Sequence, residues 1–292
     1  MLSLGKQSGA KTAAGMAQTV SASPTGETAP GSSTPKPFTE QPRPSTNLTS
    51  LRILTVNTHK GFNWLNRRYI LPELRDAVRT LSTDVVFLQE VLGVHHGHAS
   101  RFTSWANAPQ YEFLADTMWH EYAYGRNAVY PEGHHGNALL SKFPILRHEN
   151  LDISVSGHEE RGLLHSVLDV PGKPDVHAIC VHLGLHESHR KLQLELLCDL
   201  LATLPPDDPV IVAGDFNDWR RKADVQLNQC GLHEVFVQTT GQPARTFPAR
   251  LPVLCLDRVY LRNARCAKAQ AHTRRPWSHL SDHIPLSVEI LL

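Results

Sequence analysis

Polar side chains gather at the ends of the hydrophobic runs of this chain. They are Asn57, Glu90, His182, Asp215, Asn217, Asp257, Asp282 and His283. Functional groups collect at strand ends because a sheet fixes their positions while the adjoining loops admit substrate. Taken singly, a strand-terminal Asn or Asp more often caps a turn than catalyses a reaction. The set as a whole supplies carboxylates that suit Mg²⁺ and imidazoles that suit acid–base chemistry.

The hydrophobic runs predict the elements that position these groups. LRILTVN (51–57) and DVVFLQE (84–90) are typical of buried strands, and a helix is expected over 68–81 between them. Further strands are predicted at 136–141, 145–153, 162–170, 175–183, 209–215, 233–238, 256–262 and 283–290, and further helices near 99–107, 187–204 and 220–230. Strands with helices in both halves indicate an α/β (α+β) fold, a four-layer α/β/β/α sandwich with two mixed β-sheets.

Two segments carry more specific expectations. Residues 91–135 are rich in His, Trp and Tyr and are predicted to form long loops around the helix near 99–107. The predicted helix 187–204 should turn its leucines toward the sheet. Its apolar side is expected to hold Leu192, Leu196, Leu197, Leu200 and Leu201.

The composition limits the classes of protein. The chain has 292 residues, 41% of them hydrophobic, with 29 Lys and Arg against 28 Asp and Glu, which suits one globular domain of ordinary size, or at most two. Its longest apolar runs, such as 85–88 and 210–213, fall far short of the ~20 residues that cross a bilayer. Five Cys with no C-x-x-C pair predict neither a disulfide framework nor a zinc knuckle, so a reducing, cytoplasmic location is expected.

Two regions differ in composition or charge from the rest of the chain. Residues 1–48 are mostly Ser, Thr, Gly, Pro and Ala, which cannot bury enough apolar area to fold, so a disordered tail is expected before a folded domain at 49–292. The tail lacks the apolar core of a signal peptide. Residues 220–275 carry eleven Lys and Arg against three acids. This excess could form a face for a phosphate-bearing partner or a solvated surface.

Several segments, taken in order, carry a resemblance to a known family. They are TVNTHKG (55–61), VVFLQEV (85–91), GNALLSKFPI (136–145), ICVHLGL (179–185), VIVAGDFND (210–218), LDRVYL (256–261) and SDHIPL (281–286). Together they resemble the endonuclease/exonuclease/phosphatase superfamily over residues 51–290, and GDFN with a C-terminal SDH is the most specific part. The THKG, EERG and TFPARLPVLCLDRVY sequences look most like a bacterial subgroup whose substrate is poorly defined. The resemblance implies that 49–292 is a catalytic domain of this type.

The resemblance implies a divalent metal site. It assigns the metal to Glu90 and Asp282, with Asn57 completing the outer coordination or orienting Glu90. Mg²⁺ is the expected cofactor, with Mn²⁺ as a substitute, because Mg²⁺ prefers one or two carboxylates together with water and substrate phosphate.

The resemblance also implies roles for the other strand-end residues. Asp215 matches the carboxylate that orients and deprotonates the attacking water, and Asn217 would hydrogen-bond that water or a phosphoryl oxygen. His283 would stabilise the scissile phosphate or act as the acid, with Asp257 holding its other ring nitrogen. His182 corresponds to a second histidine that contacts the phosphate.

Three further positions are assigned to substrate binding. Glu160 would orient His182 and Arg161 would hold a substrate phosphate, with a surface acid–base cluster as an equal alternative. Asn137 would make a polar contact to substrate or serve a turn.

The remaining histidines have simpler interpretations. The spacing of His182, His186 and His189 could suggest zinc. The first lies at a strand end and the other two begin a helix, so one shared ion is not required. Those of the loop region are interpreted first as solvated residues: His95, His96, His98, His134 and His135.

These inferences favour a Mg²⁺-dependent, nuclease-like hydrolase that cleaves a phosphodiester by attack of water, without a covalent intermediate. A nucleic acid would use the basic stretch 220–275 and stack on Trp64, Trp105, Trp119 and Trp219. A phospholipid headgroup or an inositol phosphate is the main alternative, since apolar residues of 91–135 could rest on a bilayer. A non-catalytic binding protein is a third, which loss of a key residue would favour. The protein is expected to be a monomer.

Overall fold

The computed structural model describes residues 48–292, except for 100–101, 103–104, 106–107 and 156–158. The chain divides into two units, 1–46 and 47–292, and every described element lies in the second. The strands are β1 (Ser50–Asn57), β2 (Val85–His95), β3 (Glu121–Tyr130), β4 (Gly133–Ser141), β5 (Ile145–Asp152), β6 (Gly162–Leu168), β7 (Val176–His182), β8 (Val210–Asp215), β9 (His233–Glu234), β10 (Asp257–Arg262), β11 (Arg265–Ala271) and β12 (Leu286–Leu291). The helices are η1 (His59–Gly61), α1 (Leu71–Thr80), α2 (His96–Ala99), α3 (Gln110–Ala115), α4 (Glu187–Thr203), α5 (Lys222–Gln229), α6 (Val235–Thr240) and α7 (Trp277–Leu280).

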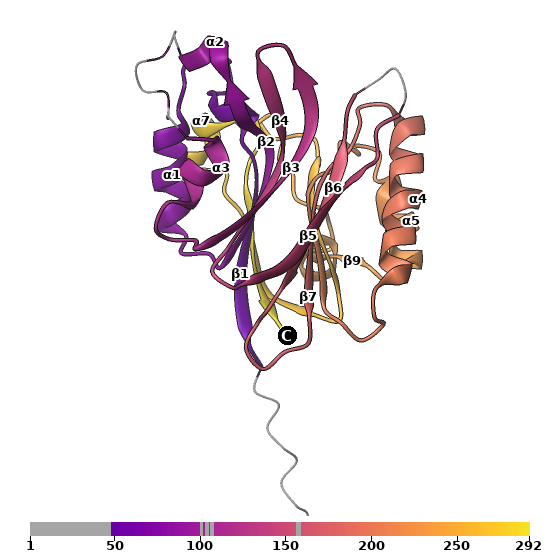
Figure 1. Ribbon diagram of the computed structural model, residues 1–292. Helices are drawn as coiled ribbons and strands as arrows, with labels where there is room; N and C mark the ends of the chain where they lie inside the picture. The colour runs from indigo at the N-terminus through magenta and orange to yellow at the C-terminus, as the bar shows by residue number, and fades with distance from the viewer. Residues whose placement is uncertain (1–47, 100–101, 103–104, 106–107, 156–158) are drawn as a thin grey trace, which may run out of the picture. The chain divides into compact units, whose positions relative to one another are not determined.

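The described strands form two sheets of six. The first sheet has the order β11-β12-β1-β2-β4-β3 and the second has the order β5-β6-β7-β8-β10-β9. Each sheet contains one parallel pair, β1 with β2 and β7 with β8, among antiparallel neighbours. Helices α1, α3 and α7 lie on the outer side of the first sheet, and α4 and α5 lie on the outer side of the second (Figure 1). The predicted four-layer α/β/β/α fold with two mixed sheets is confirmed.

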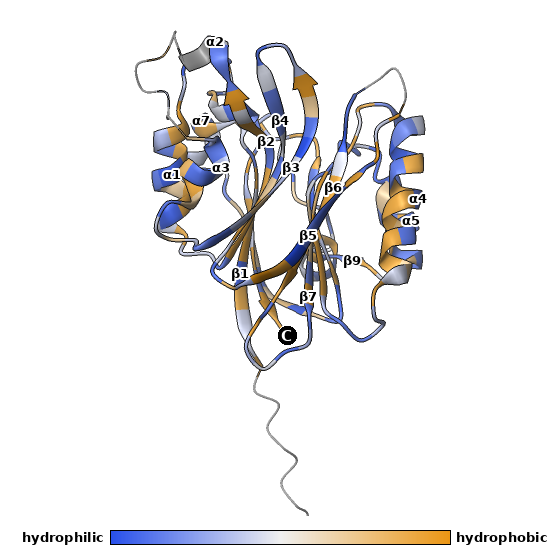
Figure 2. Ribbon diagram, viewed as in Figure 1, coloured by the Kyte–Doolittle hydropathy of each residue, from blue (hydrophilic) through white to orange (hydrophobic). Residues whose placement is uncertain are grey.

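The central strands are hydrophobic at nearly every position because both faces of each sheet are covered. In β1, Leu51 and Ile53 belong to the core between the sheets, whereas Leu54 and Val56 belong to the core beneath the helices. Figure 2 shows the hydrophobic colour concentrated along the strands. Because each strand is held from both sides, the polar residues at its end occupy defined positions.

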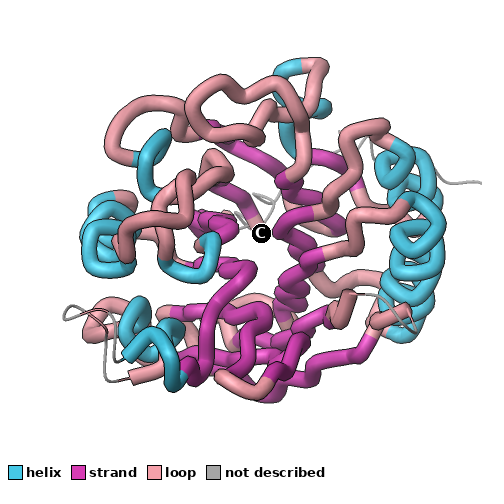
Figure 3. Tube along the Cα trace, turned by 90° about the horizontal axis from the view of Figure 1, so that it is seen from above, coloured by secondary structure: helices cyan, strands magenta, loops and turns pink. Residues whose placement is uncertain are grey.

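The two parallel pairs bring the functional strand ends together. Asn57 at the end of β1 pairs in register with Gln89, the residue before Glu90. His182 at the end of β7 pairs with Asp215 at the end of β8, and antiparallel β10 begins with Asp257 opposite Asp215. Figure 3 looks down the sheets from the end where β1 and β2 finish.

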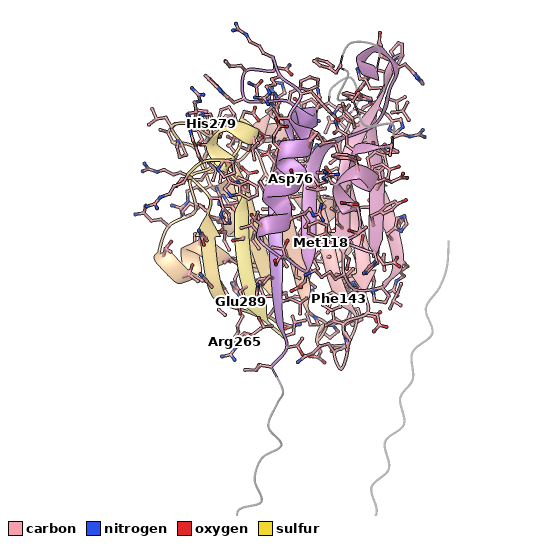
Figure 4. All side chains as sticks on the ribbon, turned by 90° about the vertical axis from the view of Figure 1, so that its left-hand side faces the viewer. Asp76, Met118, Phe143, Arg265, His279 and Glu289 are labelled. Atoms are coloured by element: carbon pink, nitrogen blue, oxygen red, sulfur yellow. A yellow bond between two sulfur atoms is a disulfide. The ribbon has the colours of Figure 1, made fainter. Side chains whose placement is uncertain are left out.

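The last functional residues return to this end through α7. Figure 4 shows Arg265 of β11 and His279 of α7 at opposite ends of the first sheet, so the chain crosses the sheet between them. Asp76 of α1 lies in front of the strands that this helix covers. Asp282 follows α7 almost directly, at the end where the other strand-end residues lie.

Some element predictions are wrong. The strand predicted at 233–238 is only the two-residue β9, because Glu234 caps α6 by accepting the amide N–H of Val237 (2.5 Å). The long loops predicted over 91–135 are largely replaced by the end of β2, by α3 and by β3, which pairs with β4. The helix predicted near 99–107 falls mostly outside the described residues.

The apolar side of α4 also differs from the predicted one. Leu192 and Leu196 are half exposed. The sequence has leucines all around this helix, so their number does not reveal which stripe faces the sheet. The buried side consists of Arg190, Gln193, Leu194, Leu197 and Leu201.

A disulfide joins the two helices on the second sheet. Cys198 of α4 is bonded to Cys230, which follows the last residue of α5, with Cα atoms 5.8 Å apart. The expectation that the cysteines form no disulfide is therefore wrong for this pair. Their separation of 32 residues carries no sequence signal, because the two sulfur atoms meet only through the packing of α4 beside α5.

Cys198→Ser should lower the free energy of unfolding by about 3–4 kcal/mol, the loop-closure entropy of a cross-link of this span. Urea unfolding with and without reductant measures the effect, and the variant should no longer respond to reductant. Cys255→Ser removes an unbonded thiol and is the matched control. Equal stability of the wild type and Cys198→Ser without reductant would contradict a stabilising disulfide.

Candidate active site

A buried carboxylate stands at the centre of the functional strand ends. Asp215 is 1% exposed. Its Oδ2 accepts a hydrogen bond from Nδ2 of Asn57 (3.2 Å) and lies 3.7 Å from Nε2 of His182 and 3.8 Å from Nε2 of His283. Its Oδ1 accepts the backbone N–H of Asn217 (2.9 Å). Side chains from both sheets therefore converge on one carboxylate.

The GDFN motif builds the turn that holds this carboxylate. Gly214 has a φ of 148°, and a Cβ there would stand 2.0 Å from the carbonyl oxygen of Val181. Only glycine therefore lets β8 lie against β7 at this point. Asn217 has a φ of 50° and donates from Nδ2 to the carbonyl of Leu183 (2.9 Å). That bond fixes the loop after β8 to the loop after β7.

His283 is oriented by Asp257. Its Nδ1 lies 2.8 Å from Oδ2 of Asp257, which leaves Nε2 facing Asp215. Burial alone would lower the pKa of His283, but the charges of Asp257 and Asp215 outweigh burial and raise the pKa to about 10. His283 is therefore a cation at neutral pH.

The two other titratable groups of this centre are Asp215 and His182. Burial raises the pKa of Asp215 to about 7, and the charge of His283 opposes this rise. A group with a pKa near the working pH can both take up and release a proton. Burial and, after it, the charge of Arg161 hold the pKa of His182 well below its usual value. His182 is therefore a neutral imidazole beside a titratable carboxylate.

The residues assigned to a metal meet around Asn57. Glu90 has a φ of 56° and sits at a bulge in the pairing of β2 with β4, a backbone irregularity common beside active sites. Nδ2 of Asn57 lies 3.5 Å from Oε1 of Glu90. The carbonyl of Asn57 accepts the hydroxyl of Ser281 (2.7 Å), whose Oγ lies 3.3 Å from Oδ1 of Asp282. Asn57 therefore connects the two carboxylates.

The chemistry of these donors fits Mg²⁺. Glu90 and Asp282 are hard oxygen ligands, and Mg²⁺ is usually bound by one or two carboxylates while it keeps several waters. Oδ1 of Asn57 accepts the backbone N–H of His59 (3.0 Å), so the side chain turns its amide nitrogen toward Glu90. Of the two roles predicted for Asn57, this geometry favours orienting Glu90.

A second group of possible ligands is already bonded within itself. Asp215, Asp257 and His283 each bring one ligand atom within 4.8 Å of the others, and no other group of three or more His, Cys, Asp or Glu does so among the described residues. The hydrogen bond of His283 to Asp257 occupies one atom of each. This arrangement suits proton transfer and charge stabilisation more than metal binding.

Asn137 was predicted to contact substrate, and the structure gives it an internal position. It is fully buried, and Nδ2 donates to the carbonyls of Gly162 (3.0 Å) and Cys180 (3.3 Å). These bonds join β4 of the first sheet to β6 and β7 of the second. Asn137 therefore pins the two sheets together and does not reach solvent.

Of the two residues predicted before β6, only Arg161 faces the site. Glu160 accepts the backbone N–H of Val129 (3.0 Å) and is not the partner of His182. Arg161 pairs with the neighbouring Glu159 (3.4 Å), and its charge acts on His182. The prediction that Glu160 orients His182 is therefore wrong. The phosphate contact of Arg161 stays a prediction, and its guanidinium already donates to the carbonyls of Leu183 (3.3 Å) and Glu160 (3.3 Å).

Some residues of the site carried no clear sequence signal. His135, interpreted as solvated, is half buried with Nδ1 out of reach of any hydrogen-bond partner among the described residues, and burial lowers its pKa to about 4. Arg190 of α4 donates to the carbonyls of Gly184 (3.1 Å) and Leu185 (2.6 Å). Its guanidinium lies 4.8 Å from the ring centre of Trp219. Arg190 therefore braces the loops that follow β7 and β8.

The features predicted to meet nucleic acid are only partly available. Trp119 is 1% exposed and donates to the carbonyl of Thr83 (3.2 Å), so it cannot stack on a base. Within the basic stretch 220–275, Arg258 is fully buried and pairs with Asp224 (2.9 Å). Arg258 therefore does not contribute to a basic surface.

Comparisons with known proteins identify a family and similar sequences. The chain matches the sequence profile of the Endonuclease/Exonuclease/phosphatase family over residues 54–283. The uncharacterized protein YbhP of Escherichia coli (strain K12) is 56% identical over 246 residues, which cover 83% of this chain and 97% of YbhP. A UPF0294 protein of Vibrio cholerae is 37% identical over 122 residues, which cover 40% of this chain and 39% of that protein.

Solved structures share the fold at low identity. An endonuclease/exonuclease/phosphatase from Beutenbergia cavernae superposes with a TM-score of 0.67 at 19% identity, covering 83% of this chain and 72% of that chain. D. rerio TDP2 complexed with single strand DNA product superposes with a TM-score of 0.61 at 17% identity, covering 83% of this chain and 99% of that chain.

The pKa of Asp215 predicts how stability changes with pH. The folded-state pKa of about 7 stands above the ordinary value of 3.8, so the contribution of Asp215 to the stability of metal-free protein should decrease as pH rises from about 4 to about 7. Asp215→Asn cannot ionise, so its stability relative to the wild type should rise by about 2–4 kcal/mol across that window. Denaturant unfolding in chelator measures both profiles. Parallel profiles would mean that Asp215 ionises as easily in the folded protein as in the unfolded chain.

Proposed function

The chain belongs to the Endonuclease/Exonuclease/phosphatase family, and on this premise we propose that it hydrolyses a phosphodiester by attack of water with the help of a divalent metal. The observation that carries the proposal is the titratable Asp215 between the neutral His182 and the cationic His283. Such a centre offers a base, a neutral hydrogen-bond donor and a positive charge to one reacting group.

Asp215 would act as the base. With a pKa of about 7, a substantial fraction of its carboxylate is ionised at neutral pH and can accept a proton from water. The hydrogen bonds from Asn57 and Asn217 hold its two oxygens in place. Nδ2 of Asn217 already donates to the carbonyl of Leu183, which supports a positioning role for Asn217.

The two histidines would bind the phosphoryl group. His283 is held by Asp257 and its pKa is about 10, so it is better suited to stabilise negative charge than to give up a proton. His182 is neutral and can donate one hydrogen bond to a phosphoryl oxygen. Charge stabilisation that strengthens as the transition state forms is the usual source of acceleration at such sites.

Glu90 and Asp282 would hold Mg²⁺, or Mn²⁺ in its place, and the bound ion neutralises charge on the phosphoryl group. Asn57 would orient Glu90, and Ser281 would fix Asp282 through their shared contacts. The bulge at Glu90 is a feature that can redirect a side chain beside an active site, and it supports this assignment.

Nucleic acid is the substrate class that we favour. The D. rerio TDP2 of similar fold was solved with a single strand DNA product, and this supports a nuclease-like activity. Phospholipids and inositol phosphates are the alternative substrates. No helix in the described part of the chain is long and apolar enough to cross a membrane. A panel of plasmid, single strands, phospholipids and inositol phosphates with purified protein and Mg²⁺ tests the assignment.

The monomeric state and the cytoplasmic location remain predictions. The disulfide between Cys198 and Cys230 argues against the cytoplasmic location, because disulfides persist mainly in oxidising compartments. A non-catalytic binding protein also remains an alternative, although every residue that the reaction needs is present: Glu90, Asp215, Asp257, Asp282 and His283.

The metal requirement follows from the carboxylates beside Asn57. Activity should vanish in excess chelator and return with Mg²⁺ or Mn²⁺ because no side chain replaces the charge of the ion. Glu90→Gln should raise the metal concentration that gives half-maximal rate by about tenfold or more. Glu149→Gln, on the edge strand β5, is the matched control and should leave the metal titration unchanged. Full activity in chelator would contradict the proposal.

The separate roles of Asp215, His283 and Asp257 can be measured with one variant of each residue. Asp215→Asn keeps the shape but removes the base, so the turnover number should fall about 10²–10⁴-fold. His283→Ala should reduce turnover far more than affinity, and Asp257→Asn should give a milder defect because it only orients the imidazole. Steady-state kinetics of the three variants on one substrate decide the matter. Near-wild-type turnover of Asp215→Asn or His283→Ala would rule out the catalytic assignment.

A further inference from the structure

A pocket of about 690 Å³ lies between η1, the end of β2 and the end of β3. This volume falls within the roughly 300–1,000 Å³ of small-ligand sites. Its floor is apolar and buried, and its rim carries exposed basic side chains. The residues that matter here are Lys60, Phe62, Arg67, Leu92, His95 and Tyr130.

Aromatic rings lead from this pocket toward the active site. Tyr130 stands between His95 and His135, with ring centroids 5.8 Å and 5.9 Å away. The charge of Lys60 acts on His95, His135 and His182 alike, so its ammonium lies within electrostatic reach of all three. Because Lys60 lines the pocket and its charge acts on His182 of the active site, the pocket lies within electrostatic reach of that site.

The backbone around Lys60 is held in an uncommon conformation. His59, Lys60 and Gly61 have φ values of 47°, 55° and 80°. Non-glycine residues keep such values only where surrounding contacts impose them. The buried Gln110 supplies these contacts, since Nε2 donates to the carbonyl of Lys60 (2.9 Å) and Oε1 accepts the N–H of Leu92 (2.9 Å). The backbone of the turn that carries Lys60 is thereby fixed to Leu92 of the pocket.

The lining suits a nucleotide better than an acyl chain. A base has flat faces that can stack on Tyr130 or His95, and its polar edges can meet the carboxylate of Glu132. Lys60 and Arg67 can contact the phosphates on either side of such a base. An acyl chain would cover these charged groups without giving them a partner, which is unfavourable.

We propose that this pocket binds the base of an unpaired nucleotide next to the phosphate that is cleaved, so that single-stranded nucleic acid is the substrate class. The inference rests on the proposed function, which places the reacting phosphate beside Asp215. Tyr130 and His95 stack on the base, and Lys60 contacts the phosphate between the pocket and the active site. A paired base would first have to unpair and leave its stack, which is unfavourable, so an unpaired base enters more easily.

The test is a binding measurement that needs no catalysis. Fluorescence anisotropy in chelator compares a labelled decamer of thymidylate with a decamer of the same backbone that lacks bases. The wild type should bind the thymidylate decamer more tightly. Tyr130→Ala should weaken that binding by about 5- to 150-fold, the range for loss of one stacked base. The same variant should leave the affinity for the abasic decamer unchanged.

Matched variants separate stacking from charge and from folding. Tyr130→Phe keeps the ring and should retain the affinity. Tyr122→Ala removes an exposed tyrosine from the other end of β3, outside the pocket, and should change neither affinity. Lys60→Ala should weaken binding of both decamers equally and reduce the salt dependence by about one phosphate contact. Melting curves of each variant exclude loss of fold as the cause.

Three results would overturn the proposal. They are equal wild-type affinity for the two decamers, equal weakening of both by Tyr130→Ala, and Tyr130-dependent binding to vesicles of anionic phospholipid without binding to the thymidylate decamer. Hydrolysis of the same decamer with Mg²⁺ is scored separately. Base-dependent binding without hydrolysis would overturn the proposed function and leave the nucleotide pocket standing, whereas hydrolysis with base-independent binding would do the reverse.

Discussion

The buried carboxylate of Asp215 is the constraint on which the rest of this structure depends. A side chain that is 1% exposed is unstable as an anion unless donors and positive charge surround it. Its donors are Asn57 at the end of β1 and the backbone of Asn217 after β8, and its positive neighbour is His283 after α7. Because these groups belong to different sheets, the site exists only when the two sheets pack in one register.

Polar contacts beneath the site specify that register. Nε2 of Gln89 on β2 lies 3.2 Å from Sγ of Cys180 on β7, and Asn137 on β4 donates to the carbonyls of Cys180 and Gly162. These bonds cross an interior that is mostly apolar. A slip of one strand would leave several buried polar groups without partners, which is more unfavourable than the loss of an exposed bond. The apolar core drives the sheets together, and these few contacts select their alignment.

The sequence predicts the parts of this arrangement that depend on local pattern. Hydrophobic runs identify β1, β2, β7 and β8, and the polar residues Asn57, His182 and Asp215 end their strands as predicted. Glu90 does not end β2, which continues to His95 beyond a bulge. The sequence does not predict which polar residues are buried in the interior. Asn137 resembled a turn residue, yet it joins two sheets, and His135 resembled a solvated residue, yet it is half buried beside the active site. Both outcomes depend on which strands face each other, and that information lies in contacts between residues far apart in the chain.

The predictions for the cysteines and for the strand at 233–238 were wrong for the same reason, because both depend on contacts that the local pattern does not contain. Cys198 and Cys230 meet because α4 and α5 lie side by side on the second sheet. Glu234 ends β9 because its carboxylate caps the helix that follows. A run of β-branched and aromatic residues such as 235–237 is typical of a strand unless that cap is recognised. Residue type determines which bonds and conformations are possible at these positions, and tertiary contacts determine which of them forms.

The charge of the centre gives an independent argument for a cation. Glu90, Asp215, Asp257 and Asp282 gather where an anionic phosphodiester would bind, and His283 lies against two of them, 2.8 Å from Asp257 and 3.8 Å from Asp215. Like charges at short range repel strongly where they are buried. A cation held by Glu90 and Asp282 would reverse this balance and would also favour the ionised form of Asp215, because nearby positive charge lowers the pKa of a carboxylic acid. The base and the cofactor would then be linked, since Asp215 would lose its proton most readily in protein that is already loaded with metal.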